Sequence, residues 1–217
     1  MPRGVAKKID RSRASLASLR RLPLYLEICR QAEAEGQTVI SGTVIAEELN
    51  LDAIQVRKDL SITGVLGKPR IGYGVQDLIQ KIDFFLRWDQ SHSAALIGVG
   101  KLGQALLAYR DLRRYNFNIL FGFDNDPQKI GKEFEGVTVY DVALMQEMLK
   151  THQVEIVVIA TPDFVALDVA SVAYNAGVRK FWNFTPRRFK LPGEVLIYTE
   201  SLMTGYSVLS VREPSRS

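Results

Sequence analysis

Three closely spaced glycines could bring a stretch of backbone next to a phosphate group. Gly98, Gly100 and Gly103 stand in the segment 94–103, AALIGVGKLG, which begins as a short apolar run. A buried strand that ends in a glycine turn at a helix N-terminus presents backbone N–H groups and the positive end of the helix dipole to an anion. The spacing therefore favours a pyrophosphate ligand, and a dinucleotide in particular.

Asp124 strengthens this interpretation. It follows another apolar segment, 118–123, and lies 21 residues past Gly103. In dinucleotide-binding folds an acid at about this distance accepts hydrogen bonds from the adenosine ribose. A carboxylate repels a ribose 2′-phosphate and no arginine follows this one, so NAD(H) is favoured over NADP(H). The alternative is that Asp124 only caps the turn before Pro127.

The chain around these residues alternates between two patterns. Short apolar runs are typical of buried strands, and the stretches between them have helical period. We expect strands from residue 94 and over 118–123, 137–139, 154–160, 180–184 and 195–199, with helices over 104–115, 141–150 and 164–176. This alternation predicts an α/β fold, a Rossmann-type doubly wound parallel sheet over residues 94–199. Ligands bind beyond the carboxyl ends of such strands, where Thr161, Pro162, Asn183 and Phe184 would join the glycines.

Residues 16–88 have the organisation of a winged helix-turn-helix, an N-terminal DNA-binding domain. A helix is expected over 16–35, with Pro23 starting a fresh helix at its first turn. Two short helices follow, the second over 53–62, and the glycine-rich segment 64–74 is expected to form a small hairpin, the wing. The alternative is a structural helical cap.

Several polar and basic side chains of this region could contact DNA, by reaching base edges or holding phosphates. The candidates in the second short helix and the wing are Gln55, Arg57, Lys58, Ser61, Lys68 and Arg70. Residues 1–22, a basic arm that includes the start of the first helix, add Arg3, Lys7, Lys8, Arg11, Arg13, Arg20 and Arg21. The alternatives are a solvated helix face and a disordered tail.

The composition is that of a globular protein and argues against disulfide-linked, zinc-binding and membrane-spanning classes. The 217 residues are 47% hydrophobic and 24% charged, with a net charge of +4, which is ordinary for a globular protein. A single cysteine, Cys29, excludes an intrachain disulfide, and two histidines offer no zinc cluster. No apolar run approaches the roughly 18 residues of a membrane span, and the N-terminus lacks the apolar region of a secretory signal. We expect a cytoplasmic protein without a metal, in which Cys29 is a buried structural thiol.

The sequence offers no catalytic residue beside the predicted nucleotide. Hydride transfer to a carbonyl needs a proton donor and a domain that holds the substrate. His152 precedes a strand, at the wrong end of the sheet, and His92 lies in the polar segment 89–93, which we interpret as a linker. We therefore expect the nucleotide to be a signal and the chain not to be an enzyme. The alternative is a small NAD-dependent oxidoreductase with a helical dimerisation cap.

Six short motifs, read in their order along the chain, point to a family. They are Leu22-Pro-Leu-Tyr25, Gln55-Val-Arg-Lys-Asp-Leu-Ser61, Gly72-Tyr-Gly-Val75, the turn 98–103, Phe123-Asp-Asn-Asp-Pro127 and Asn183-Phe-Thr-Pro186. Together they resemble the Rex family of redox-sensing transcriptional repressors. The resemblance implies a homodimer that binds a palindromic operator when NADH is scarce and releases it when NADH rises.

The resemblance also implies roles for individual residues. The glycines would bind the pyrophosphate together with Val99, Lys101 and Leu102. Toward the nicotinamide would lie Thr161, Pro162 and Phe184. The residues that would contact the operator are Arg57, Lys58, Lys68 and Arg70. Residues 200–217 would form a dimerisation helix that swaps into the partner subunit, and a tail. In this helix Ser201 replaces the family's usual acid, and Gly205 weakens the helix by about 1 kcal/mol relative to alanine. A repressor without a nucleotide response is therefore a third alternative.

Overall fold

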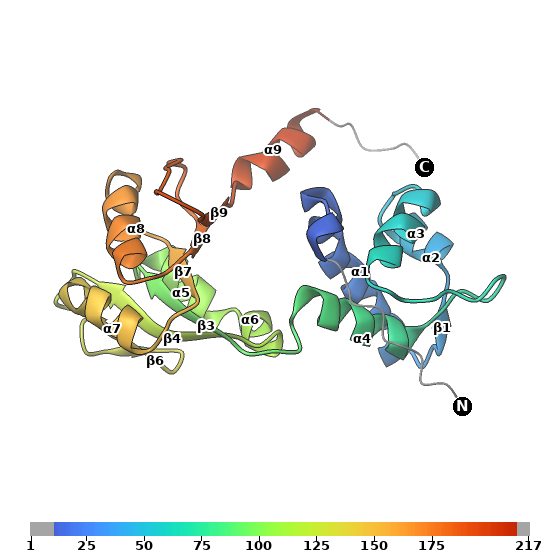
Figure 1. The fold of residues 1–217 in the computed structure, drawn as a ribbon, viewed down its shortest axis with the longest axis horizontal. Helices are drawn as coiled ribbons and strands as arrows, with labels where there is room; N and C mark the ends of the chain where they lie inside the picture. The colour runs from blue at the N-terminus through green and yellow to red at the C-terminus, as the bar shows by residue number, and fades with distance from the viewer. Residues whose placement is uncertain (1–10, 212–217) are drawn as a thin grey trace. The chain divides into compact units, whose positions relative to one another are not determined.

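The computed structural model describes residues 11–211 and divides between Gln90 and Ser91 into two compact units (Figure 1). The N-terminal unit is mainly helical, and the C-terminal unit is built on a sheet. Within 11–211, no helix is long and apolar enough to cross a membrane. The same residues contain no group of three or more His, Cys, Asp and Glu side chains that could hold a metal ion.

Helices α2 and α3 of the N-terminal unit form a helix-turn-helix that packs against α1. The elements of the unit are a 3₁₀ helix (Arg11–Arg13), α1 (Leu16–Ala34), β1 (Val39–Ile40), α2 (Gly42–Glu48), α3 (Ala53–Ile62), β2 (Tyr73–Gly74) and α4 (Val75–Leu86). The core is shared by Leu22 and Leu26 of α1, Leu60 of α3 and Leu78 and Ile82 of α4, all fully buried. Asp52 caps α3 by accepting hydrogen bonds from two backbone N–H groups of its first turn.

Two expectations for this unit need correction. Pro23 does not start a new helix, because α1 runs through it as one element. Its ring fits the helical φ, and buried residues on both sides, Leu22 and Tyr25 among them, hold the helix together despite the missing N–H. The segment 64–74 forms only a minimal hairpin, with one bridge between Lys68 and Gly72, and β2 pairs with β1 instead.

The C-terminal unit alternates strands with helices. Its elements are β3 (His92–Ile97), α5 (Lys101–Ala108), α6 (Arg110–Arg114), β4 (Phe117–Asp124), β5 (Glu133–Phe134), β6 (Val137–Asp141), α7 (Met145–Thr151), β7 (Ile156–Ile159), α8 (Ala166–Asn175), β8 (Lys180–Asn183), β9 (Leu196–Thr199) and α9 (Leu202–Val211). In this described part the strands make a seven-stranded sheet of order β5-β6-β4-β3-β7-β8-β9. Every neighbouring pair is parallel except β5 with β6.

This strand order is that of a doubly wound Rossmann sheet, and it confirms the predicted fold class. The chain adds β4 and β6 on one side of β3, then returns to add β7, β8 and β9 on the other side. Strand order therefore reverses between β3 and β7. In open parallel sheets the ligand crevice lies at this point, beyond the carboxyl ends of the two strands.

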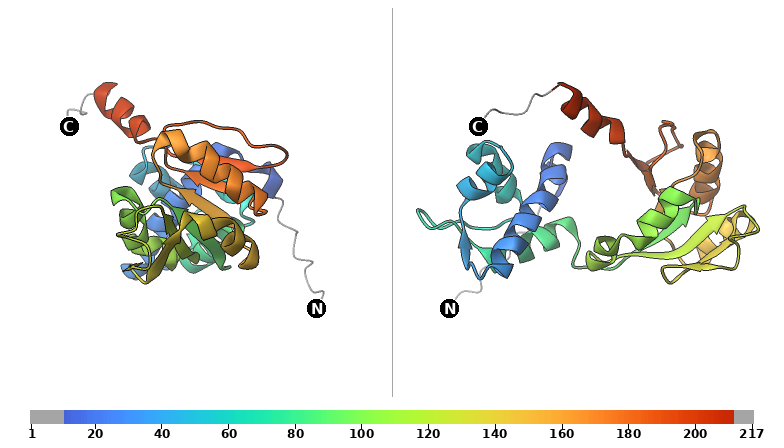
Figure 2. Two further views of the ribbon diagram at one scale, coloured as in Figure 1. Left: turned by 90° about the vertical axis from the view of Figure 1, so that its left-hand side faces the viewer. Right: turned by 180° about the vertical axis from the view of Figure 1, so that it is seen from behind.

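Helices cover both faces of the sheet (Figure 2). Ala95, Ile97 and Phe123 pack on one face in a cluster with buried residues of α7 and α8. Leu96 points to the other face, where it clusters with Leu107 of α5. Because successive strand residues face opposite sides, a strand buried on both faces is apolar throughout. This explains the unbroken apolar run before the glycines.

The structure also corrects three details in this unit. The helix expected over 104–115 breaks at Tyr109, whose extended ψ of 96° separates α5 from α6. The segment between the strands expected over 118–123 and 137–139, for which no helix or strand was expected, contains the short strand β5. His92 is not a linker residue, because it begins β3 and its Nδ1 lies 2.8 Å from Oε2 of Glu155. Glu155, the residue just before the neighbouring strand β7 (Ile156–Ile159), thus gives this polar residue of the sheet a partner.

Candidate nucleotide and DNA sites

The three glycines of the turn after β3 meet different surroundings. Gly98 has φ of +91°, and a Cβ there would lie 2.7 Å from the carbonyl oxygen of Ala160. A Cβ on Gly103 would lie 2.1 Å from the carbonyl oxygen of Gly98, so α5 packs directly on the turn. A Cβ on Gly100 would meet no atom within 4 Å. The fold itself requires Gly98 and Gly103, whereas Gly100 leaves the backbone open to a ligand, as a pyrophosphate needs.

Asp124 lies against this turn. Its Oδ2 accepts hydrogen bonds from the backbone N–H of Val99 at 2.8 Å and from Nζ of Lys129 at 3.1 Å, and its Oδ1 accepts from the backbone N–H of Asp126 at 3.0 Å. Asp124 is buried. Burial raises the pKa of Asp124, but the donors from Asp126, Val99 and Lys129 outweigh it and hold the pKa below its ordinary value. Asp124 is therefore an ionised acceptor next to the glycines.

The carboxyl ends of β7 and β8 complete this edge of the sheet. Thr161 follows β7 directly beside Gly98, since a Cβ on Gly98 would lie 2.9 Å from the backbone nitrogen of Thr161. Pro162 is exposed next to it. After β8, the ring of Phe184 packs beside Trp182, with 4.9 Å between ring centroids. Lys101 and Leu102 are exposed in the first turn of α5.

Asn183 is buried, and its side-chain groups are engaged within the protein. Its Nδ2 donates to the carbonyl oxygen of Arg187 at 2.9 Å and to Oγ1 of Thr199 at 3.2 Å. Its Oδ1 accepts from the backbone N–H and the hydroxyl of Thr185 at 3.0 and 2.8 Å. The side chain therefore shapes the loop after β8, which carries Phe184.

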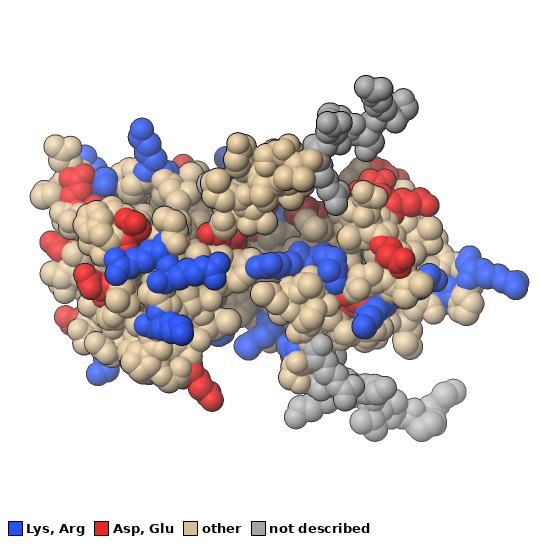
Figure 3. Space-filling model, turned by 90° about the horizontal axis from the view of Figure 1, so that it is seen from above, with Lys and Arg blue, Asp and Glu red and all other residues tan. Residues whose placement is uncertain are grey.

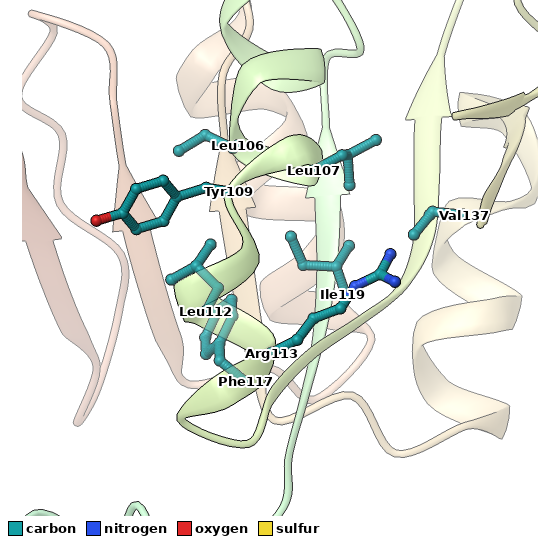
Figure 4. A pocket seen from close by; sticks show the side chains of 8 residues that line it. All are labelled: Leu106, Leu107, Tyr109, Leu112, Arg113, Phe117, Ile119 and Val137. Atoms are coloured by element: carbon teal, nitrogen blue, oxygen red, sulfur yellow. The ribbon is translucent and has the colours of Figure 1, made fainter. Parts of the chain in front are cut away.

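A separate cavity between α5, α6 and β4 is too small for an organic ligand. Figure 4 shows its lining side chains: Leu106, Leu107, Tyr109, Leu112, Arg113, Phe117, Ile119 and Val137. Its volume is about 10 Å³, which is the space of a single water molecule.

A buried carboxylate anchors α3 to α1 in the N-terminal unit. Asp59 is 1% exposed and accepts hydrogen bonds from Nε of Arg21 at 2.6 Å, from the hydroxyl of Tyr25 at 2.8 Å and from Nε2 of Gln55 at 2.9 Å. Burial raises the pKa of Asp59, but the hydrogen bonds from Arg21 and Tyr25 outweigh burial and lower it. Sequence reasoning missed this residue. Its signal was an acid on the inner face of α3, beside the buried Val56 and Leu60.

The outer surface of α3 and the wing carry exposed cations. Arg57, Lys58, Lys68 and Arg70 are all exposed, and Figure 3 shows Lys and Arg side chains protruding at the end of this unit where the wing extends in Figure 1. Arg70 has φ of +63°, a left-handed conformation that is uncommon for a residue other than glycine. Ser61 is exposed as well, and its hydroxyl donates to the carbonyl oxygen of Lys58 at 2.7 Å.

Two arginines of the basic arm bind other parts of the protein. This corrects the expectation that they are free to contact DNA. Arg11 donates from Nε to the carbonyl oxygen of Phe85 at 2.8 Å, and from its Nη2 to that of Phe84 at 2.6 Å. Arg21 is paired with Asp59. Both arginines therefore stabilise the unit. Residues 1–10 and the side chain of Arg13 lie outside what the structure describes.

Two family models match the chain. One, described as a CoA binding domain, covers residues 89–187, and the other, described as a putative DNA-binding protein N-terminus, covers residues 14–61. Three solved structures of a Rex-family repressor cover 91% of this chain each, at 27–28% identity and TM-scores of 0.83–0.84. One is described as a complex with NADH, and another as a complex with NAD+ and operator DNA.

Curated relatives match over nearly the full chain. A redox-sensing transcriptional repressor Rex from Treponema denticola is 42% identical over 194 residues, which is 89% of this chain and 92% of the relative. The Rex repressor of Bacteroides thetaiotaomicron is 33% identical over 94% of this chain and 92% of its own length. These relatives are named repressors and not enzymes. The chain belongs to the Rex family of redox-sensing transcriptional repressors.

Proposed function

We propose that this protein is a transcriptional repressor that binds operator DNA through its N-terminal unit and senses NAD(H) at the carboxyl edge of its sheet. The observation that carries the proposal is the open glycine turn at Gly100, with the ionised Asp124 beside it, in a chain that also has a helix-turn-helix. The complexes described for the similar Rex-family repressor, with NADH and with NAD+ and operator DNA, support it. NAD(H) is thus a sensed ligand and not a reactant.

Different residues at the carboxyl edge of the sheet would bind different parts of the nucleotide. The turn formed by Gly98, Val99, Gly100, Lys101, Leu102 and Gly103 would hold the pyrophosphate. Because the N–H groups of Gly98 and Val99 already donate to Phe123 and Asp124, the donors to the pyrophosphate would come from the later residues of the turn. Asp124 would bind the adenosine ribose, and Thr161, Pro162 and Phe184 would lie toward the nicotinamide. Asn183 would act indirectly by fixing the loop that carries Phe184. When bound, the nicotinamide supplies the redox signal, because its two forms differ by one positive charge and in ring planarity. The nucleotide can shift DNA affinity only through contacts that differ between these forms, and a tenfold shift needs about 1.4 kcal/mol.

The DNA surface would combine α3 with the wing. Arg57 and Lys58 project from α3 and would contact base edges or phosphates, while Lys68 and Arg70 would reach the neighbouring groove from the wing. The side-chain amide of Gln55 donates a hydrogen bond to Asp59, so a role at a base edge requires that Gln55 reorient or share this amide. Ser61 remains a phosphate candidate, and Arg13 remains a candidate in the arm.

We propose further that the repressor is a homodimer in which α9 packs on the partner subunit. Every residue of α9 whose side chain is described is exposed, including Met203, Tyr206 and Leu209, so the helix has an apolar surface without cover. A hollow of about 280 Å³ on the sheet, lined by Trp182 and Tyr198 among others, is a second uncovered apolar surface. A dimer would bury such surfaces. We also propose a cytoplasmic location, because a repressor that senses NAD(H) must share a compartment with its nucleotide and its DNA.

The test is a titration of NADH into a complex of the full chain with operator DNA, with NAD+ as the control nucleotide. We expect NADH to weaken operator binding at least tenfold, with NAD+ having a smaller effect. Unchanged operator affinity at saturating NADH would reject the switch. Arg57→Ala should weaken operator binding and leave NADH affinity intact, and loss of both would identify Arg57 as a structural residue.

A further inference from the structure

A lysine shares the carboxylate that we assign to the adenosine ribose. Nζ of Lys129 lies 3.1 Å from Oδ2 of Asp124 and 3.5 Å from Oδ2 of Asp126. The expectation that the site prefers NAD(H) rested on Asp124 and on the missing arginine after it. A cation does follow, five residues along the chain, and only the folded loop brings it back to the carboxylate.

The position of Lys129 is fixed by the loop between β4 and β5. Its backbone N–H donates to the carbonyl oxygen of Asp126 at 2.9 Å, and its side chain is 26% exposed. The ammonium is therefore partly buried against the site. Burial lowers the pKa of Lys129, but Asp124 and Asp126 outweigh burial and raise it, so the ammonium stays charged.

Most hydrogen-bond acceptor sites of the Asp124 carboxylate are already occupied. Oδ2 accepts from Val99 and Lys129, and Oδ1 accepts from Asp126. A carboxylate offers about four acceptor sites, so three are occupied. Ribose hydroxyls that donate to Asp124 must share it with the ammonium or displace the ammonium, and the long flexible side chain of a lysine allows either.

The charge of the subsite depends on this lysine. Asp124 and Asp126 together contribute two negative charges, and the positive charge of Lys129 reduces the local net charge to one negative charge. A ribose 2′-phosphate would be repelled by the carboxylates, and this repulsion grows with their net charge. An ammonium at the same place is also a donor that binds phosphate as a point charge.

We propose that Lys129 is a specificity-determining residue of the adenosine subsite, where it moderates the rejection of a 2′-phosphate by Asp124. The inference rests on the NAD(H) site proposed above. It means that the preference for NADH over NADPH is smaller than Asp124 alone would give, and that removing the ammonium increases this preference.

The experiment measures the dissociation constants of NADH and NADPH for the full chain, using the fluorescence of the reduced nicotinamide that both share. The variants are Lys129→Gln, Lys129→Arg and, as a matched control, Lys132→Gln, an exposed lysine in the same loop. We expect the NADPH to NADH ratio of dissociation constants to rise at least tenfold in Lys129→Gln. Lys129→Arg, which keeps the charge, should restore the wild-type ratio, and Lys132→Gln should not change it.

The outcomes separate this inference from the proposed function. An unchanged ratio in Lys129→Gln, with normal NADH binding by the wild type, overturns the inference alone. An equal loss of affinity for both nucleotides also overturns it, because Lys129 would then only hold Asp124 in place. Failure of the wild type to bind either nucleotide overturns the NAD(H) site and this inference with it.

Discussion

The backbone N–H of Val99 donates to Oδ2 of Asp124 over 2.8 Å and thereby joins the turn after β3 to the end of β4. The two parts of the sheet edge that we assign to the pyrophosphate and the ribose are thus one hydrogen-bonded structure. A substitution at either residue should therefore change the conformation of the other. The bond also fixes the first N–H after Gly98 and so helps to hold the turn in this conformation.

Gly100→Ala and Gly103→Ala should separate ligand binding from folding. A methyl group at Gly100 meets open space, so the protein should fold normally and lose NADH affinity at least tenfold, because the methyl occupies the approach to the backbone. A methyl at Gly103 would lie 2.1 Å from a backbone oxygen and should lower the free energy of unfolding by several kcal/mol. Thermal unfolding and fluorescence titration measure the two effects. Normal NADH binding by Gly100→Ala would contradict the assignment of the turn.

Arg70→Gly should weaken DNA binding with little effect on stability. Relief of the left-handed conformation and the extra freedom of glycine in the unfolded chain nearly cancel, so the free energy of unfolding should change by less than about 1 kcal/mol. Operator affinity should fall about tenfold, and the slope of log affinity against log salt should decrease by about 1. Binding measured at several salt concentrations checks this.

Arg87→Gly is the matched control for Arg70→Gly. Arg87 also has φ of +63°, but it caps the C-terminus of α4 and lies outside the wing. The same chemical change in the same backbone conformation should leave operator affinity unaltered. An equal loss of affinity in both variants would show that the effect comes from the backbone and not from a contact of the wing.

Asp59→Asn should destabilise the protein by about 3 kcal/mol, because it leaves a partly buried arginine without its counter-ion. The matched control, Asp83→Asn, breaks the more exposed pair of Asp83 with Arg30 and should cost less than about 1 kcal/mol. Chemical denaturation of each variant measures both values. Equal effects would mean that burial of the Asp59 cluster contributes nothing extra.

The stabilisation by Asp59 should also depend on pH. Its pKa is lower in the folded than in the unfolded protein, so its contribution is complete above the unfolded value, about 3.9, and is lost as the pH falls through the folded value. Wild-type stability should therefore decrease in acid more steeply than that of Asp59→Asn. Denaturation curves between about pH 6 and about pH 2, a range that begins above the unfolded pKa and ends well below it, test this. Parallel curves for the two proteins would contradict the prediction.

The thiol of Cys29 should be unreactive in the folded protein. Cys29 is fully buried, and burial raises its pKa to about 12, so it carries almost no thiolate at pH 8. A thiol reagent should label it slowly in native conditions and completely in denaturant. Because the chain has one cysteine, the reaction has a single source. Rapid labelling of the native protein would show that α1 opens readily.

Local patterns in the sequence were sufficient for the fold class and for the family. The strand that leads to Gly98 can be predicted from its composition, because burial on both faces requires apolar residues at every position. The glycines indicate a close approach of two backbone segments, because only glycine tolerates it. Such requirements act within a few residues, so they can be read without knowing what lies across the molecule.

The tertiary structure alone decided which charged and polar residues meet. Asp59 and Arg21 are 38 residues apart in sequence, and no local pattern distinguishes an arginine in a buried pair from one facing DNA. The same holds for the hydrogen bond between Asn183 and Thr199 and for the pair of His92 with Glu155. The free energy of a charge depends on the solvent and partners around it, and chain folding sets these through contacts between distant segments.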